Sequence, residues 1–487
     1  MAAHLSISLE KAHHMLAEKE GPYTDQQARV EASRCLYCFD APCVQSCPTG
    51  IDVPAFIRRI AEGNPRGAAR VILEANILGA SCSRVCPTTV LCEGACVVAQ
   101  KEGDPVKIGR LQRYATDFVA GEAHTLLSVK SAKTGCSVGV IGAGPAGLAC
   151  AAELARLGHE VVIYEKKAFG GGLNTYGVAY YKMPPQVSLE EVALVEKLGV
   201  TIQYHTEIGR DLTGEELLQK HHLLFLGVGL GRASSLGIPN ENSKGILDAL
   251  DFIENIRVTT QNTISVGANV VIIGCGNTAM DAAIQARLLG AKTVTVLYRR
   301  SESEMPAYRF EYERAKKEGI NFLFNTLPVQ IFLSSDRHIE RLRLAGTRYN
   351  SNGELEIIRG TEWEIPCDML IKATGQQKLT SWILQNFPTV QLSSKGLILH
   401  DPQTGQTSDP RIFTGGDCAN GGREVVHAVA EGKRAAKAMH QIFSAKTATH
   451  PSPHHYSSHS PNLHNPNSLL AGHTAEPAYF RSSLAYS

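Results

Sequence analysis

The sequence of 487 residues lacks any apolar run of about 18 residues, the length that predicts a membrane-spanning helix. Its first 30 residues are charged and mixed, without the apolar core of a secretory signal. Excess charge is lacking as well, because 48 Lys and Arg against 47 Asp and Glu leave a net charge of +1. This balance excludes a broad electrostatic affinity for nucleic acid or an anionic membrane. We therefore expect a soluble, cytoplasmic protein that has neither as a partner.

Cysteine is abundant, with 13 in the chain, and eight of these residues crowd between Cys35 and Cys96. Crowded cysteines in a cytosolic chain are typical of metal ligands rather than of disulfides. The first set has the spacing C-x2-C-x4-C-x3-C and is followed by Pro48, and the second has the spacing C-x3-C-x5-C-x3-C. The two sets are Cys35, Cys38, Cys43 and Cys47, and Cys82, Cys86, Cys92 and Cys96.

These spacings favour two [4Fe-4S] clusters. The second set lacks the C-x2-C pair that a structural zinc site normally shows twice, so one or two zinc ions are the weaker alternative. In two-cluster ferredoxins the cysteine before proline serves the other cluster. We therefore expect Cys47 to cross to the second cluster and one late cysteine to cross back.

The pattern of apolar residues changes along the chain. Val53–Glu62 and Pro65–Asn76 have helical periodicity, which predicts a small helical domain around the cysteines. From Ser137 onward, short β-branched runs lead into glycines and then into helix-like segments, as in parallel α/β units. This happens twice, at Val138–Gly142 and Val270–Gly274, so two nucleotide-binding domains are predicted.

The first glycine turn follows the predicted strand Ser137–Ile141 and has the form G-x-G-x-x-G. Glu165 follows the next predicted strand, Val161–Tyr164, where a carboxylate accepts hydrogen bonds from an adenosine ribose. An acid at this position favours an unphosphorylated ribose, such as that of FAD. The predicted FAD-binding turn consists of Gly142, Ala143, Gly144, Pro145, Ala146 and Gly147.

The second glycine turn has no acid at the equivalent position. Its next predicted strand, Val294–Tyr298, ends in Arg299 and Arg300, a pair that suits the 2′-phosphate of NADPH. Two solvated arginines at a strand end are the alternative. The turn itself consists of Gly274, Cys275, Gly276, Asn277, Thr278 and Ala279.

A third signal lies after the second turn, at Thr407–Asp417, which predicts a turn, a short strand and an exposed carboxylate. Asp417 can hold the flavin ribityl hydroxyls, and a helix predicted from Glu424 can stabilise negative charge on reduced flavin. Since this element follows the NAD(P) turn, the NAD(P) domain is expected to be inserted in the FAD domain, with the return crossing at Ala373, Thr374 and Gly375.

The predicted fold is therefore α/β, with an N-terminal α-helical domain for two [4Fe-4S] clusters and two Rossmann-like domains, the second inserted in the first. The last segment is rich in His, Ser, Pro and Asn, which predicts disorder. The expected boundaries are 1–120 for the iron–sulfur domain, 121–235 and 376–445 for the FAD domain, 236–375 for the NAD(P)H domain and 446–487 for the tail.

The motifs resemble, in their order, those of the iron–sulfur flavoproteins that comprise the glutamate synthase small subunit and the N-terminal half of dihydropyrimidine dehydrogenase. The likeness covers about residues 25–445. In the pyrimidine branch a glutamine completes one cluster, where glutamate synthase small subunits have a glutamate, and this sequence has Gln112. From the residues alone, Cys82 would be the better iron ligand. The resemblance instead implies one cluster on Cys35, Cys38, Cys43 and Cys96, and the other on Cys47, Cys86, Cys92 and Gln112.

The resemblance also implies that Leu173, Lys182, Gly416 and Val425 contact FAD, and that electrons pass from NADPH or NADH through FAD and the clusters to a partner. No FMN-binding barrel follows residue 445. The expected partner is therefore a separate FMN-containing, barrel-type subunit that reduces uracil and thymine, in a heterotetramer. No residue of this chain is expected to act on the pyrimidine. The alternative is a glutamate synthase small subunit.

Overall fold

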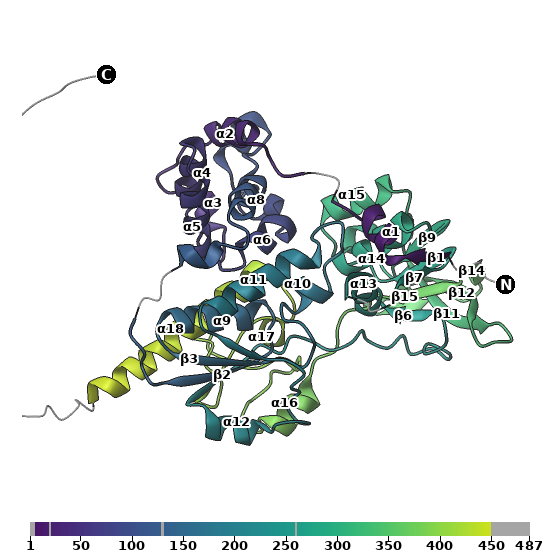
Figure 1. Cartoon of the computed structure of the whole chain (residues 1–487). Helices are drawn as coiled ribbons and strands as arrows, with labels where there is room; N and C mark the ends of the chain where they lie inside the picture. The colour runs from purple at the N-terminus through teal and green to yellow at the C-terminus, as the bar shows by residue number, and fades with distance from the viewer. Residues whose placement is uncertain (1–4, 19–20, 128–130, 259–260, 450–487) are drawn as a thin grey trace, which may run out of the picture. The chain divides into compact units, whose positions relative to one another are not determined.

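The computed structural model describes residues 5–18, 21–127, 131–258 and 261–449. Helices without long strands form the first region, and two five-stranded sheets form the others (Figure 1). The predicted tail lies outside the described residues from position 450 onward. The backbone of residues 446–449 continues the last helix, α18 (Val425–Thr449), so this helix includes the first four residues of the predicted tail.

The helical region contains both predicted helices, which are α4 (Val53–Ala61) and α5 (Pro65–Ala75). Each begins with a side-chain cap: Asp52 accepts from Ala55 N at 3.0 Å, and Asn64 accepts from Gly67 N at 2.7 Å. The other helices of this region are α2 (Asp25–Ser33), α3 (Pro42–Gln45), α6 (Gly79–Val85), η1 (Thr88–Val90), α7 (Val97–Glu102), α8 (Ile108–Phe118) and η2 (Ala123–Leu126).

The first sheet has the strand order β16-β5-β2-β3-β4, and each pair of adjacent strands is parallel. Its strands are β2 (Ser137–Ile141), β3 (Glu160–Tyr164), β4 (Thr201–Gln203), β5 (Leu223–Leu226) and β16 (Ile412–Thr414). The helices around it are α9 (Pro145–Arg156), α10 (Leu173–Tyr176), α11 (Pro185–Lys197), α12 (Gly214–Lys220), α16 (Thr380–Asn386), α17 (Asp417–Asn420) and α18. The expected strands at Ser137–Ile141 and Val161–Tyr164 are confirmed.

The second sheet is also parallel, with the order β10-β9-β8-β15-β6. All its strands lie in sequence between β5 and β16 of the first sheet, as an inserted domain requires. They are β6 (Ile246–Asp248), β8 (Asn269–Ile273), β9 (Thr293–Leu297), β10 (Asn321–Leu323) and β15 (Met369–Lys372), and the helices here are α13 (Ala249–Val258), α14 (Asn277–Leu288), η3 (Glu302–Glu304) and α15 (Arg309–Lys317).

An antiparallel ribbon joins β10 to β15, and it has no counterpart in the sequence analysis. Its strands are β11 (Thr326–Leu333), β12 (Ile339–Tyr349), β13 (Leu355–Ile357) and β14 (Trp363–Pro366). β12 pairs with the other three.

The first described segment differs from the expected domain layout. Residues 1–120 were expected to form one helical domain, yet β1 (Leu5–Ser8) pairs antiparallel with β7 (Thr263–Val266). The following helix, α1 (Leu9–Met15), lies among the elements of the second nucleotide-binding region (Figure 1). Leu5 and Ile7 alternate with serines, as the period of a strand requires, and of the two Ile7 is buried and Leu5 is exposed.

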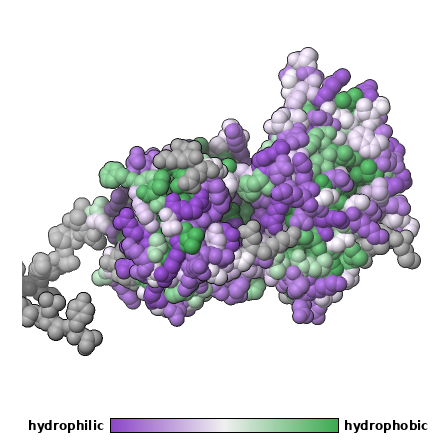
Figure 2. Space-filling model, turned by 90° about the horizontal axis from the view of Figure 1, so that it is seen from above, coloured by the Kyte–Doolittle hydropathy of each residue, from purple (hydrophilic) through white to green (hydrophobic). Residues whose placement is uncertain are grey.

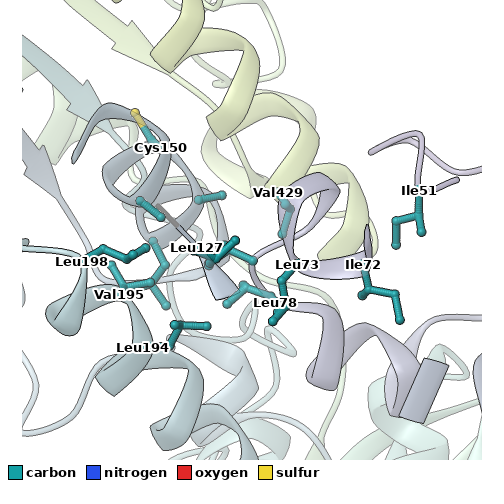
Figure 3. Packing of buried hydrophobic residues seen from close by; sticks show 14 of the residues in the cluster. Ile51, Ile72, Leu73, Leu78, Leu127, Cys150, Leu194, Val195, Leu198 and Val429 are labelled. Carbon is teal, nitrogen blue, oxygen red and sulfur yellow. The ribbon is translucent and has the colours of Figure 1, made fainter. Parts of the chain in front are cut away.

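A continuous hydrophobic core joins the helical region to the first sheet. Ile72 and Leu73 of α5 belong to the same cluster of buried residues as Val195 of α11 and Val429 of α18 (Figure 3). Buried apolar area is the main stabilising term in such contacts. The helical region is therefore held directly against the helices that cover the first sheet.

The surface view mixes hydrophilic and hydrophobic residues on the face that it shows (Figure 2). Within the described ranges, no helix combines the length and the apolar character needed to cross a bilayer.

Candidate functional site

Four cysteines meet at one small pocket with apolar walls. They are Cys35, Cys38, Cys43 and Cys96, and the walls include Val53, Ile57, Val98 and Ile108. Burial, followed by the charges of the neighbouring Cys35 and Cys96, raises the pKa of the Cys43 thiol to about 11. Deprotonated thiols at this site therefore need a compensating positive charge, which a metal centre supplies. The donor set thus fits an iron–sulfur cluster.

A second group of thiols surrounds Cys86. Burial raises its pKa, and the next largest causes are the nearby Cys82, Cys92 and Cys47. The pKa of Cys92 is also raised, first by burial, with Cys47 and Cys43 among its charged neighbours. The structure therefore brings Cys47, from the first motif, into the group formed by the second motif.

Two residues compete for the fourth position of this group. Cys82 is buried on α6, where its Sγ accepts a hydrogen bond from Asn76 Nδ2 at 3.2 Å. Gln112 is buried on α8, and its Nε2 donates to Gly79 O at 2.7 Å. That bond directs the amide nitrogen towards α6 and leaves the amide oxygen for another partner. In the part of the chain that the structure describes, no group of three or more His, Cys, Asp or Glu side chains is arranged to hold a single metal ion.

A cavity of about 1540 Å³ lies where the strands of both parallel sheets end. Its lining residues include Gly142 after β2, Gly274 after β8 and Ala373 after β15. Nucleotides bind at the carboxyl ends of parallel strands. The volume exceeds the range of about 300–1,000 Å³ for ordinary ligand pockets. It therefore suits more than one nucleotide.

The first glycine turn has the geometry of a pyrophosphate cradle. Gly142 has φ +96°, and a Cβ there would lie 2.6 Å from Gly227 O. A Cβ at Gly147 would lie 2.0 Å from Gly142 O, so glycine is needed where α9 packs on its own turn. Gly144, by contrast, has no heavy atom closer than 4.0 Å to its ideal Cβ, and it lines the cavity. This open space beside the start of α9 fits a bound phosphate.

Glu165 and Asp417 supply carboxylates to this end of the cavity. Glu165 is buried, and its two oxygens accept from Ala143 N at 2.9 Å and from Lys167 N at 2.8 Å. These bonds hold the carboxylate at the glycine turn and leave lone pairs for a ribose. Asp417 begins α17, and burial raises the pKa of its carboxyl group. The residues thus fit the FAD that the sequence predicts.

The second glycine turn repeats the first. Gly274 has φ +117°, and a Cβ there would lie 2.2 Å from Ala373 O. A Cβ at Gly276 would meet no heavy atom within 4 Å. Gly276, Thr278, Thr374 and Gly375 all line the cavity. A second nucleotide therefore fits the start of α14.

Arg299 and Arg300 follow β9, line the same cavity and are exposed. They have no carboxylate within ion-pair distance among the residues that the structure describes. Hydrogen bonds with Tyr349 and Ser301 lower the pKa of the Glu304 carboxyl group, and Arg300 lies near enough to help lower it, but Glu304 forms no direct ion pair with Arg300. Two guanidinium groups that no carboxylate pairs with directly are suited to bind a phosphate.

Three predicted cofactor residues lie outside the cavity wall. Gly147 packs α9 on its turn, as described above. Asn277 turns its Oδ1 to accept from Tyr308 N at 2.9 Å. Lys182 is buried in an ion pair with Asp281 at 2.7 Å and in a second with Glu311. The structure thus places Lys182 between the two nucleotide-binding regions.

Sequence reasoning missed several cationic residues of the cavity wall, among them Arg232 and Arg423. Each follows closely after glycines, at Gly231 and Gly422, and glycine is common where backbone approaches a ligand. A charged residue directly after a glycine was the signal that could have found these two arginines.

The second thiol group lies next to the edge of the cavity. Glu424 is flanked by Arg423 and Val425, which line the cavity, and its carboxylate is among the neighbours that raise the pKa of Cys86. The Tyr308 hydroxyl donates to Glu424, and its pKa is raised, first by burial. This junction joins the cysteine region to both nucleotide-binding regions.

Comparisons with known proteins show which families the chain is similar to. The family described as dihydropyrimidine dehydrogenase domain II, 4Fe-4S cluster, matches residues 12–124, and that of pyridine nucleotide-disulphide oxidoreductases matches residues 136–432. The NAD-dependent dihydropyrimidine dehydrogenase subunit PreT of Escherichia coli (strain K12) is 37% identical over 430 residues, covering 88% of this chain and 97% of PreT. The glutamate synthase [NADPH] small chain of the same strain is 35% identical over 435 residues, covering 85% and 91%.

Among solved structures, Mycobacterium tuberculosis FprA in complex with NADPH is similar with a TM-score of 0.51 at 17% identity, covering 64% of this chain and 86% of FprA. This likeness concerns the fold. The cysteine region and the two nucleotide-binding regions together define an iron–sulfur flavoprotein, an NAD(P)-dependent oxidoreductase. More narrowly, the chain belongs to the family of PreT-type dihydropyrimidine dehydrogenase subunits and glutamate synthase small chains, which confirms the resemblance stated above.

Proposed function

We propose that this chain is the electron-input subunit of a dihydropyrimidine dehydrogenase. It oxidises NAD(P)H through FAD and passes electrons through two [4Fe-4S] clusters to an FMN-containing, barrel-type partner. That partner reduces uracil and thymine to 5,6-dihydropyrimidines. The observation that supports this relay is the position of Cys86, beside Glu424 at the edge of the nucleotide cavity.

Each group of residues has a role in this proposal. Gly144 and Gly276 admit the two pyrophosphates, and Glu165 and Asp417 hold hydroxyls of FAD. FAD, when bound, converts a two-electron hydride into the single electrons that a cluster accepts. Cys35, Cys38, Cys43 and Cys96 hold one cluster, and Cys47, Cys86, Cys92 and Gln112 hold the other.

The favoured nucleotide is NADPH. Arg299 and Arg300 lack acidic partners at the strand end where NAD-binding folds place an acid. The printed names of the relatives differ on this point, since PreT is NAD-dependent and the glutamate synthase chain uses NADPH. The arginine pair supports the second nucleotide for this chain.

The partner is inferred from the relative that is itself named a subunit of dihydropyrimidine dehydrogenase. Two copies of each chain in a heterotetramer are the proposed assembly. The second candidate is a glutamate synthase small chain, which the arginine pair and the 35% identity to that NADPH enzyme favour. Gln112, in the position where that branch has a glutamate, supports the first candidate.

The relay is tested on anaerobically purified protein by iron and flavin analysis, where about eight irons and one FAD per chain are expected. Two zinc ions and no iron would contradict the proposal. Gln112→Ala is expected to lose one cluster, with its electron paramagnetic resonance signal, whereas Cys82→Ala keeps both. The reverse result would transfer the fourth ligand position to Cys82.

The partner is tested by co-purification and reconstitution. The isolated chain is expected to reduce artificial dyes with NADPH and to leave uracil unchanged. Adding the FMN-containing chain is expected to restore uracil reduction. If the co-purified chain instead forms glutamate from 2-oxoglutarate and glutamine, the second candidate is correct.

A further inference from the structure

The main chain that carries the arginine pair is held by three hydrogen bonds from the antiparallel ribbon. Thr326 N donates to Tyr298 O at 3.0 Å, and Asn325 N donates to Arg300 O at 2.9 Å. Between them, the hydroxyl of Thr347 donates to Arg299 O at 2.8 Å. The first two bonds come from main-chain groups, so the third is the one that a side-chain substitution removes.

Thr347 is well placed for this role because the ribbon holds it rigidly. It lies on β12, the residue is 4% exposed, and its N donates to Asn325 O at 2.8 Å. Asn325 has φ +49°, a conformation that asparagine tolerates better than most residues. Thr326 and Leu327 of the ribbon line the cavity next to the arginines.

A fixed main chain matters most for the side chains of Arg299 and Arg300. Both side chains are exposed, and no ion pair orders them within the described residues. A long, mobile side chain loses rotamer freedom when it binds a phosphate, and a misdirected backbone would add to that loss. Fixing the Arg299 peptide plane limits the directions in which its guanidinium group leaves the strand end.

We propose that Thr347 is a positioning residue for the 2′-phosphate of NADPH, because its hydroxyl holds the Arg299 carbonyl and so directs the Arg299 side chain into the cavity. This inference rests on the proposed use of NADPH. It makes the ribbon, and not only the end of β9, part of the nucleotide specificity of the chain.

The test measures binding of 2′,5′-ADP and of 5′-AMP to the FAD-loaded protein by isothermal titration calorimetry. Thr347→Val keeps the shape of the side chain and removes the hydroxyl. It is expected to weaken 2′,5′-ADP by about threefold to tenfold, the effect of one lost hydrogen bond, and to leave 5′-AMP unchanged. Thr347→Ser keeps the hydroxyl and is expected to retain the wild-type affinity for both.

Thr293→Val is the matched control, because the Thr293 hydroxyl donates to Asn269 Oδ1 at 2.9 Å at the far end of β9, outside the cavity wall, and no change in either affinity is expected. Arg299→Ala, measured alongside, tests the proposed function separately. If it weakens 2′,5′-ADP while Thr347→Val does not, the role of Thr347 is wrong and the NADPH site stands.

Equal weakening of 2′,5′-ADP and 5′-AMP by Thr347→Val would also overturn the inference, since Thr347 would then have a general structural role. An unchanged affinity for 2′,5′-ADP in Arg299→Ala would overturn the NADPH site and this inference together. A steady-state check separates these cases again, because Thr347→Val is expected to raise KM for NADPH without changing KM for NADH or kcat.

Discussion

The glycine turn after β2 and the glycine turn after β8 share one backbone and differ in charge. Gly144 and Gly276 have φ −76° and −91° with the same ψ of 178°, and each caps a twelve-residue helix. Yet β3 leads to the buried acid Glu165, whereas β9 leads to two exposed arginines. In the proposed function, the shared backbone binds a pyrophosphate, and the residues after the next strand select the nucleotide.

The two turns also differ at their third small residue, and this difference gives the largest expected effect. Gly147→Ala would place a Cβ 2.0 Å from Gly142 O, whereas the second turn already accommodates the buried methyl group of Ala279. Gly147→Ala is expected to cost about 1–3 kcal/mol of unfolding free energy and to yield protein without flavin. Ala279→Gly is the matched control, with a cost of about 1 kcal/mol and FAD retained.

Chemical denaturation and the absorbance of bound flavin check this pair of variants. Full flavin content in Gly147→Ala would contradict the role assigned to the first turn.

Removing the acid of the first turn is the next test of the comparison. Glu165→Gln keeps one acceptor oxygen and removes the negative charge. The carboxylate oxygens that it replaces accept from Ala143 N and Lys167 N and are proposed to accept from the ribose. The affinity for FAD is expected to fall by about 1.5–3 kcal/mol, or roughly tenfold to hundredfold. Titration of FAD into the flavin-free protein measures this change. An unchanged affinity would mean that Glu165 only supports the loop.

The success of the sequence analysis at these turns has a local cause. A left-handed φ at Gly142 and Gly274 and a close approach at Gly147 require glycine, so the motif records the geometry directly. The alternation of strand and helix that places the turns is equally local. The acid and the arginines follow their turns at similar distances along the chain, with Glu165 23 residues after Gly142 and Arg299 25 residues after Gly274.

Other features depend on contacts distant in sequence. The pairing of β1 with β7 joins residues more than 200 positions apart, and Leu5–Ser8 alone does not specify that partner. Lys182 was expected at FAD, but its ion pairs with Asp281 and Glu311 need the packing of α14 and α15. Thr347 likewise reaches Arg299 only through the ribbon. No local pattern encodes such pairs.

Removing one positive charge beside the second turn tests the other half of the comparison. Arg299→Ala is expected to lower kcat/KM for NADPH by roughly tenfold, because one charge-assisted hydrogen bond is lost, and to leave the value for NADH unchanged. Steady-state rates of dye reduction with both nucleotides measure the ratio. Arg309→Ala is a matched control, since this exposed arginine pairs with Glu302 and lies outside the cavity wall. Equal rates with the two nucleotides in the unaltered protein would contradict the preference.

The smallest effect on the fold is expected where the two turns are most alike. The ideal Cβ of Gly144 has no heavy atom closer than 4.0 Å, and that of Gly276 has none within 4 Å, and both residues have φ values that alanine adopts freely. Gly144→Ala and Gly276→Ala should therefore change the unfolding free energy of the ligand-free protein by no more than about 0.5 kcal/mol.

In each case the new methyl group occupies the space that a pyrophosphate would fill. Gly144→Ala is expected to lose flavin, while Gly276→Ala keeps flavin and binds NADPH more weakly, as flavin absorbance and calorimetric titration would measure. Loss of flavin in Gly276→Ala would show that the two turns do not hold separate nucleotides.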